Sequence, residues 1–126
     1  MGLKTLMIIK AVVCLIFGLI LLFLPGWILS LLGSSYCPGA AITAREYGAA
    51  LIGVLMLTWF ARNAEDSVAR RAIIINLFVY DAVAFIAMLI LQLSGAMNTL
   101  GWGVVFIYLF FTVTFGYYML PQKKAA

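Results

Sequence analysis

Residues 72–93 read AIIINLFVYDAVAFIAMLILQL and carry one charged side chain, that of Asp81. A bilayer hydrocarbon core of about 30 Å is crossed by about 20 apolar residues in a helix, so this segment is long enough to span a membrane. Three further runs of similar length and character lie at about 6–29, 42–61 and 100–120. Because a helix satisfies its own backbone hydrogen bonds in lipid, the sequence predicts an all-α, polytopic membrane protein with four transmembrane helices.

The overall composition agrees with this prediction. Hydrophobic residues make up 67% of the 126 residues and charged residues 10%, against about 45–50% and about 25% in soluble domains. A soluble domain of this size could not bury so much apolar surface. The chain has no His, and its two Cys lack the spacing of zinc ligands, so we expect no metal or cofactor. The eight basic residues form no stripe, so nucleic acid is not an expected partner.

The connections between the runs are short and rich in turn residues, which predicts one domain over residues 1–126 folded as an antiparallel bundle. We interpret the first run as an uncleaved span rather than a secretory signal. Pro25-Gly26 is expected to kink or end its helix. Asp66 or Ser67 is expected to cap the third helix.

The basic residues predict the orientation. In a four-span arrangement seven of them fall on one side and only Arg45 falls on the other. Because basic loops are retained in the cytoplasm, both termini are expected there. The seven are Lys4, Lys10, Arg62, Arg70, Arg71, Lys123 and Lys124.

Asp81 is the sharpest functional candidate. It lies about ten residues into its span, near the bilayer centre, where a carboxylate costs about 2.5–3.5 kcal/mol on insertion scales. Tyr108 and Thr112 of the fourth span lie at a similar depth and are expected to supply hydrogen bonds. Two interpretations stay open, a proton or cation site and a hydrogen-bonded carboxyl that joins helices.

Four more polar residues are candidates for lipid or partner contact. Arg45 and Glu46 begin the second span, where Arg45 is expected to extend to the outer headgroups and Glu46 to be favoured by the helix dipole. Lys10 is expected to extend toward the inner surface. Asn76 is expected to hydrogen-bond another helix.

Small residues mark the expected packing faces. Gly18 lies on one side of the first span, and Gly48, Ala49 and Gly53 belong to small-xxx-small patterns in the second. Such residues let helix backbones approach closely in lipid. We expect these contacts to form mainly within the chain.

Three short motifs carry a resemblance. They are Pro25-Gly26, Arg45-x-x-Gly48 and Trp59-x-x-Arg62. With the span pattern, they make the chain resemble small four-helix bacterial inner-membrane proteins of unknown function. The resemblance implies the fold and no activity.

The expected function is non-enzymatic, because the short loops leave no room for a soluble catalytic site. We expect an accessory, assembly or structural subunit that contacts other membrane subunits, or copies of itself, within the lipid bilayer. A small proton- or cation-coupled transporter or channel that uses Asp81 is the alternative. A bundle that binds a lipid, quinone or pigment among the aromatic residues of the fourth span is the third.

Overall fold

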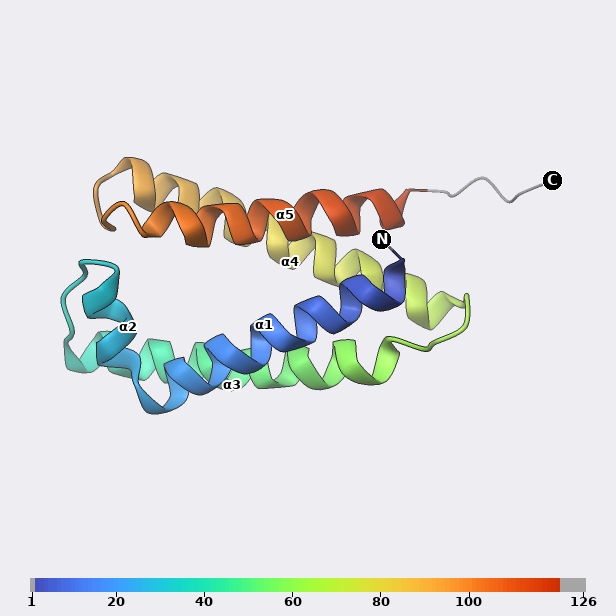
Figure 1. Cartoon of the computed structure of the whole chain (residues 1–126), viewed down its shortest axis with the longest axis horizontal. Coiled ribbons are helices and arrows are strands. Elements are labelled where there is room, and N and C mark those ends of the chain that lie inside the picture. The colour runs from blue at the N-terminus through green and yellow to red at the C-terminus, as the bar shows by residue number, and fades with distance from the viewer. Residues whose placement is uncertain (1, 121–126) are drawn as a thin grey trace.

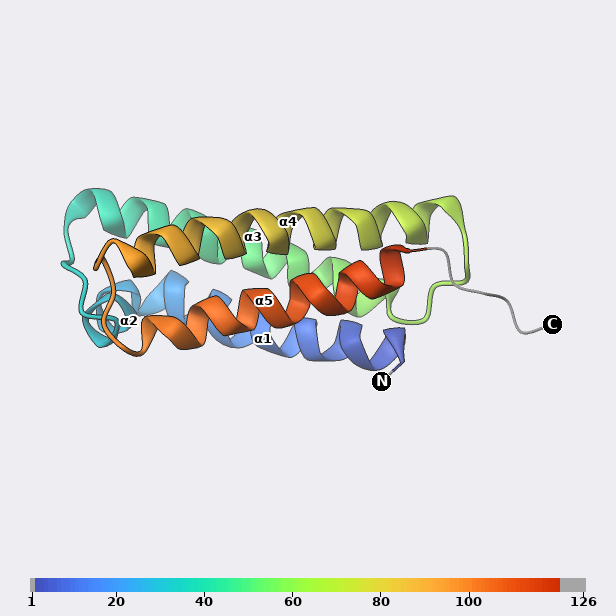
Figure 2. The same cartoon turned by 90° about the horizontal axis from the view of Figure 1, so that it is seen from above.

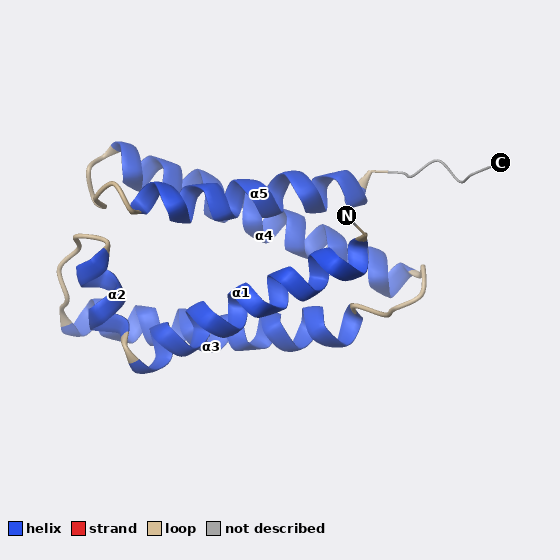
Figure 3. Cartoon of the chain, viewed as in Figure 1, coloured by secondary structure: helices blue, strands red, loops and turns tan. Residues whose placement is uncertain are grey.

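The chain is all-helical. The computed structural model describes residues 2–120, and these form five helices and no strand (Figure 3). Four helices are long and apolar enough to span a membrane, which confirms that part of the prediction. The long helices are α1 (Leu3–Phe23), α3 (Pro38–Ala61), α4 (Val68–Leu93) and α5 (Gly101–Met119), and the short one is α2 (Pro25–Leu31).

The expected first span, 6–29, is divided in two. Helix α1 ends at Phe23, and α2 begins at Pro25 after a non-helical Leu24 with φ −132° and ψ 49°. Pro25 has no N–H to donate, and its ring clashes with a preceding turn of helix, so α1 cannot continue through it. The expected break at Pro25-Gly26 is thus present, and it leaves α2 as a separate helix of about two turns.

Helices α3 and α4 each begin four residues before their expected starts, because their capping residues lie outside the apolar runs. Ser67 accepts a hydrogen bond from the Arg70 amide at 3.1 Å, so α4 begins at Val68 and includes charged residues in its first turn. At the start of α3, the Cys37 sulfur accepts from the Ala40 amide at 3.4 Å. Of the two expected caps for α4, Ser67 is the one used.

The long helices form two layers, each made of two helices. Helix α1 packs along α3 in one layer, and α4 packs along α5 in the other (Figures 1 and 2). The beginning of α1 and the end of α5 lie at the same end of the molecule, and α2 lies at the opposite end (Figure 1). Direct contact between the layers is much sparser than contact within each layer.

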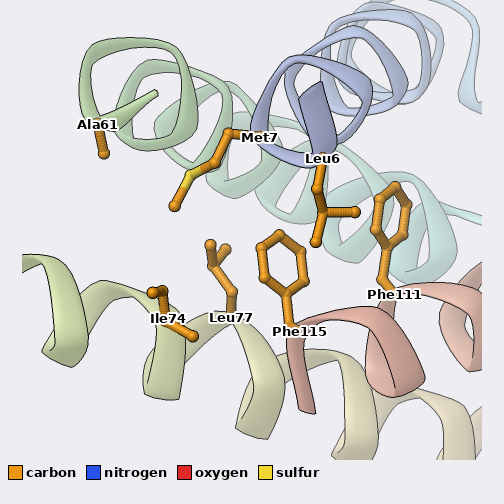
Figure 4. Packing of buried hydrophobic residues seen from close by; sticks show 7 residues of the cluster. All are labelled: Leu6, Met7, Ala61, Ile74, Leu77, Phe111 and Phe115. Carbon is orange, nitrogen blue, oxygen red and sulfur yellow. The ribbon is translucent and has the colours of Figure 1, made fainter. Parts of the chain in front are cut away.

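The layers meet in an apolar cluster near the beginning of α1. Leu6 and Met7 of α1 face Leu77 of α4 and Phe115 of α5, all fully buried (Figure 4). Ala61, Ile74 and Phe111 complete this cluster. It fixes one end of the two-layer arrangement.

Within the first layer, α1 and α3 cross at Gly18 and Gly48. A Cβ on Gly48 would lie 2.9 Å from the Gly18 carbonyl oxygen and 3.0 Å from the Leu22 nitrogen. Both obstacles are backbone atoms, which cannot move aside without separating the helices. Gly48 is therefore required for this close approach, as its small-xxx-small pattern predicted.

The outer surface of the layers is strongly apolar. Phe23 is 72% exposed, Phe60 71% and Phe106 61%. In water such a surface would cost about 25 cal/mol for each Å² of apolar area. Lipid removes that cost, so the exposed side chains are those expected of a multi-pass membrane protein.

Candidate functional site

The site centres on a buried ion pair between the two layers. The Lys10 Nζ of α1 donates to Asp81 Oδ1 of α4 at 2.5 Å, and the two side chains are 3% and 0% exposed. Lys10 was expected to extend toward the inner surface, and this expectation is wrong. The ammonium of Lys10 instead has the buried carboxylate of Asp81 as its partner. The two residues are 71 positions apart in the sequence, so their spacing gave no indication of this contact.

Aromatic rings surround the ammonium of Lys10. Its Nζ lies 4.3 Å from the ring centre of Phe111, 5.0 Å from that of Tyr80 and 6.0 Å from that of Tyr108. The negative face of an aromatic ring attracts a cation, most strongly where water is absent. The rings thus stabilise a charge that would otherwise be poorly solvated at this depth.

Beside the ion pair, three tyrosine hydroxyls from three helices form a hydrogen-bonded cluster, which we call the tyrosine cluster. The Tyr47 hydroxyl of α3 lies between those of Tyr80 of α4 and Tyr108 of α5 and is hydrogen-bonded to both. Two hydrogen bonds therefore join the three groups. The cluster links both layers at the level of the ion pair.

The side chains of Tyr108 and Thr112, which were expected to hydrogen-bond Asp81, bond to other groups. Tyr108 bonds to Tyr47, and the Thr112 hydroxyl donates at 2.7 Å to the Tyr108 carbonyl of its own helix. Thr112 thus lies outside the ion pair, and Lys10 takes the place expected for both residues. Among the described residues, Asp81 Oδ2 has no hydrogen-bond partner although it is buried.

A large cavity begins at this cluster and runs between the layers. It encloses about 500 Å³, is partly open to the surface, and has side chains of all five helices in its wall. Its polar lining side chains are Lys10, Thr43 and the tyrosine cluster, and the rest is apolar. Its lining residues on α3 run from Ala40 to Leu51, which at about 1.5 Å per residue gives a length of about 16 Å.

At the end of the cavity near α2, loops of the two layers are joined by hydrogen bonds that we call the Asn98 clasp. The Asn98 amide donates to the Leu32 carbonyl at 2.8 Å, and its side-chain Nδ2 donates to the Leu31 carbonyl at 2.9 Å. Ser34 Oγ donates to the Ala96 carbonyl at 2.9 Å. Asn98 thereby satisfies carbonyls that the end of α2 leaves free.

Gly33 makes room for the clasp. Its φ of +76° lies in the left-handed region that glycine adopts readily, and a Cβ there would lie 3.2 Å from the Asn98 side chain. The cavity is thus bounded by the apolar cluster and ion pair at one end and by the clasp at the other.

The other expected contact residues lie away from the cavity. Arg45 is exposed, and its Nε donates at 3.3 Å to the Leu22 carbonyl in the last turn of α1, where a cation is favoured. Glu46 and Asn76 are exposed on α3 and α4.

Only part of the expected packing set is packed within the chain. Gly18 and Gly48 form the crossing of α1 and α3, whereas Ala49 and Gly53 are exposed on α3. A Cβ on Gly53 would meet nothing within 4 Å. The second small-xxx-small pattern therefore lies on the outer face of the first layer.

The functional residues that the sequence did not single out are Tyr47, Tyr80 and Asn98. Two of them are tyrosines inside apolar runs, and neither sequence spacing nor composition distinguishes them from other aromatic residues. Comparison with family models, with curated proteins and with solved structures finds no match for this chain. The resemblance to small four-helix bacterial inner-membrane proteins accordingly stays a prediction.

Proposed function

We propose that this protein binds one long-chain apolar molecule between its two helix layers, within the membrane. The observation that supports the proposal is the cavity of about 500 Å³ with its apolar wall. Sites for small molecules in proteins commonly measure about 300–1,000 Å³ and have apolar linings with a few polar groups. The tyrosine cluster and Lys10 provide those polar groups at one end.

The size of the cavity argues that it is filled. A cavity of this size with an apolar wall is unfavourable when empty, because the side chains around it lose packing contacts. Ordered water needs about two to four polar partners per molecule, and most of the wall offers none. An apolar occupant fills the space and needs no polar partners.

We also propose an orientation with both termini in the cytoplasm of a bacterium and the protein in its inner membrane. Burial of Lys10 in an ion pair removes it from the orienting charges. Arg62, Arg70 and Arg71 lie in or beside the α3–α4 connection. Arg45 lies near the opposite end, so the positive-inside argument persists. The orientation prediction also used Lys123 and Lys124, which lie outside the described residues.

An accessory or structural role beside other membrane subunits is compatible with this binding activity. The exposed small residues Ala49 and Gly53 on α3 would let another helix approach closely. Transport coupled to Asp81 is less favoured, because the Lys10 ammonium already occupies one oxygen of its carboxylate.

The test is to fill the cavity and measure what remains bound. Ala84 lines the cavity on α4, whereas its neighbour Val83 is 62% exposed on the outer face. We expect native mass spectrometry of wild-type protein and of Val83→Phe, released from native membranes, to show one retained apolar molecule per chain. Ala84→Phe should lose it. Equal retention by Ala84→Phe and Val83→Phe would refute the proposed function.

A further inference from the structure

We infer that the bound molecule is uncharged and that it presents a carbonyl oxygen to the tyrosine cluster in the middle of the bilayer. This inference rests on the proposed function and specifies the chemistry of the ligand. The class includes long-chain quinones and long-chain esters, which share a carbonyl acceptor and an apolar chain.

The position of the polar groups argues against a phospholipid. Tyr47, Tyr80 and Tyr108 lie near the middle of α3, α4 and α5. From Tyr47 the cavity extends about 10 Å along α3 to Ala40, toward the α2 end. A phospholipid keeps its charged headgroup at the membrane surface, so its acyl chains would reach the polar cluster. The arrangement instead suits a molecule with its weakly polar end deep in the membrane and its chain directed toward α2.

The tyrosine cluster can donate a hydrogen bond to a ligand. Each hydroxyl is both a donor and an acceptor, and Tyr47 is hydrogen-bonded to Tyr80 and to Tyr108. All three residues line the cavity, whose wall is otherwise mostly apolar. A carbonyl oxygen on the occupant can therefore accept a hydrogen bond from the cluster.

The charges argue that the ligand is neutral. Among residues 2–120, the ionic side chains at the site are Lys10 and Asp81, which are paired with each other so that their charges cancel. A carboxylate or phosphate would add one uncompensated negative charge in a water-poor site, which is strongly unfavourable. A neutral carbonyl adds an acceptor without adding charge.

The experiment measures binding of defined probes to the full chain in mild detergent. The matched pair is a decyl-substituted benzoquinone and decylbenzene, which differ by the carbonyl oxygens. We expect the benzoquinone to bind at least about five-fold more tightly, the factor that corresponds to one net hydrogen bond. Dodecanoate, an anion, should bind more weakly than methyl dodecanoate, its neutral ester. Whichever of the benzoquinone and the methyl ester binds more tightly assigns the ligand to the quinone or ester class.

A triple variant tests the hydroxyl groups directly. Tyr47→Phe, Tyr80→Phe and Tyr108→Phe together should abolish the benzoquinone's advantage over decylbenzene, which has no acceptor for a hydroxyl proton. Tyr36→Phe is the control, because Tyr36 is exposed and lies outside the cavity lining. Should the triple variant not fold, infrared spectra of the benzoquinone on wild-type protein give the same information. The carbonyl band should lie at lower frequency than in dodecane.

The outcomes separate this inference from the proposed function. Equal binding of benzoquinone and decylbenzene, an unshifted carbonyl band, or tighter binding of dodecanoate than of its ester would overturn the inference. In those cases the cavity would still bind an apolar chain. Failure of every probe to bind, decylbenzene included, would count against the proposed function itself.

Discussion

Removing one partner of the Lys10–Asp81 pair should destabilise the protein far more than removing both. Lys10→Met keeps the length of the side chain and its contacts with the aromatic rings, but it leaves the carboxylate of Asp81 buried without its cation. Because both side chains are at most 3% exposed, screening by solvent is slight and the full cost of a broken buried pair applies. That cost is about 3–5 kcal/mol.

The double variant Lys10→Met/Asp81→Leu should recover most of this loss, because a well-packed apolar pair is commonly as stable as the ion pair it replaces. The assay is unfolding by titration of sodium dodecyl sulfate into mild-detergent micelles, followed by tryptophan fluorescence. Lys4→Met is the control, because Lys4 is exposed near the start of α1. A loss below about 1 kcal/mol for Lys10→Met, the value typical of a surface pair, would refute the reasoning. So would a double variant no more stable than the single one.

Three further predictions concern packing, the clasp and a helix cap, and the same titration measures each. Gly48→Ala places a Cβ against the α1 backbone and should cost about 1–3 kcal/mol of stability. Gly53→Ala, whose Cβ would lie in open space, should be neutral or stabilising by up to about 1 kcal/mol. Equal effects of the two substitutions would contradict the close packing of α1 and α3 at Gly48. Asn98→Ala removes the bond of the clasp from Asn98 Nδ2 to the Leu31 carbonyl and the bond that Asn98 Oδ1 accepts from the Leu100 amide. It should cost about 1 kcal/mol and speed amide exchange in the α4–α5 loop, and Thr99→Ala should change neither. Ser67→Ala removes the cap of α4 and should cost about 1 kcal/mol, so an unchanged midpoint would show that the cap is not used.

Much of the fold could be predicted because lipid imposes a simple rule. Each long apolar run must become a helix, and α5 (Gly101–Met119) lies within one residue of its expected bounds at both ends. The break at Pro25 and the cap at Ser67 follow from local chemistry, which a sequence displays directly. The early start of α4 did not follow from hydropathy, since its first turn carries Arg70 and Arg71.

The site could be predicted only in part, because its groups come together through tertiary packing. Asp81 was recognisable from its depth alone. Its partner was not, since the preference of a lysine for the membrane surface is valid only when no buried anion lies nearby. The tyrosine cluster was hidden for a similar reason, because Tyr47 and Tyr80 differ from other aromatic residues only in what they face.

The most direct test of the account is to locate the chain of a bound ligand by nuclear magnetic resonance. Met88 and Met97 line the cavity, whereas Met56 is 49% exposed on α3 and lies outside it. With methyl-labelled methionines and the decyl-substituted benzoquinone in deuterated detergent, we predict intermolecular Overhauser effects from the ligand chain to Met88 and Met97. Effects confined to Met56, or of equal strength at all three methyl groups, would contradict binding between the layers.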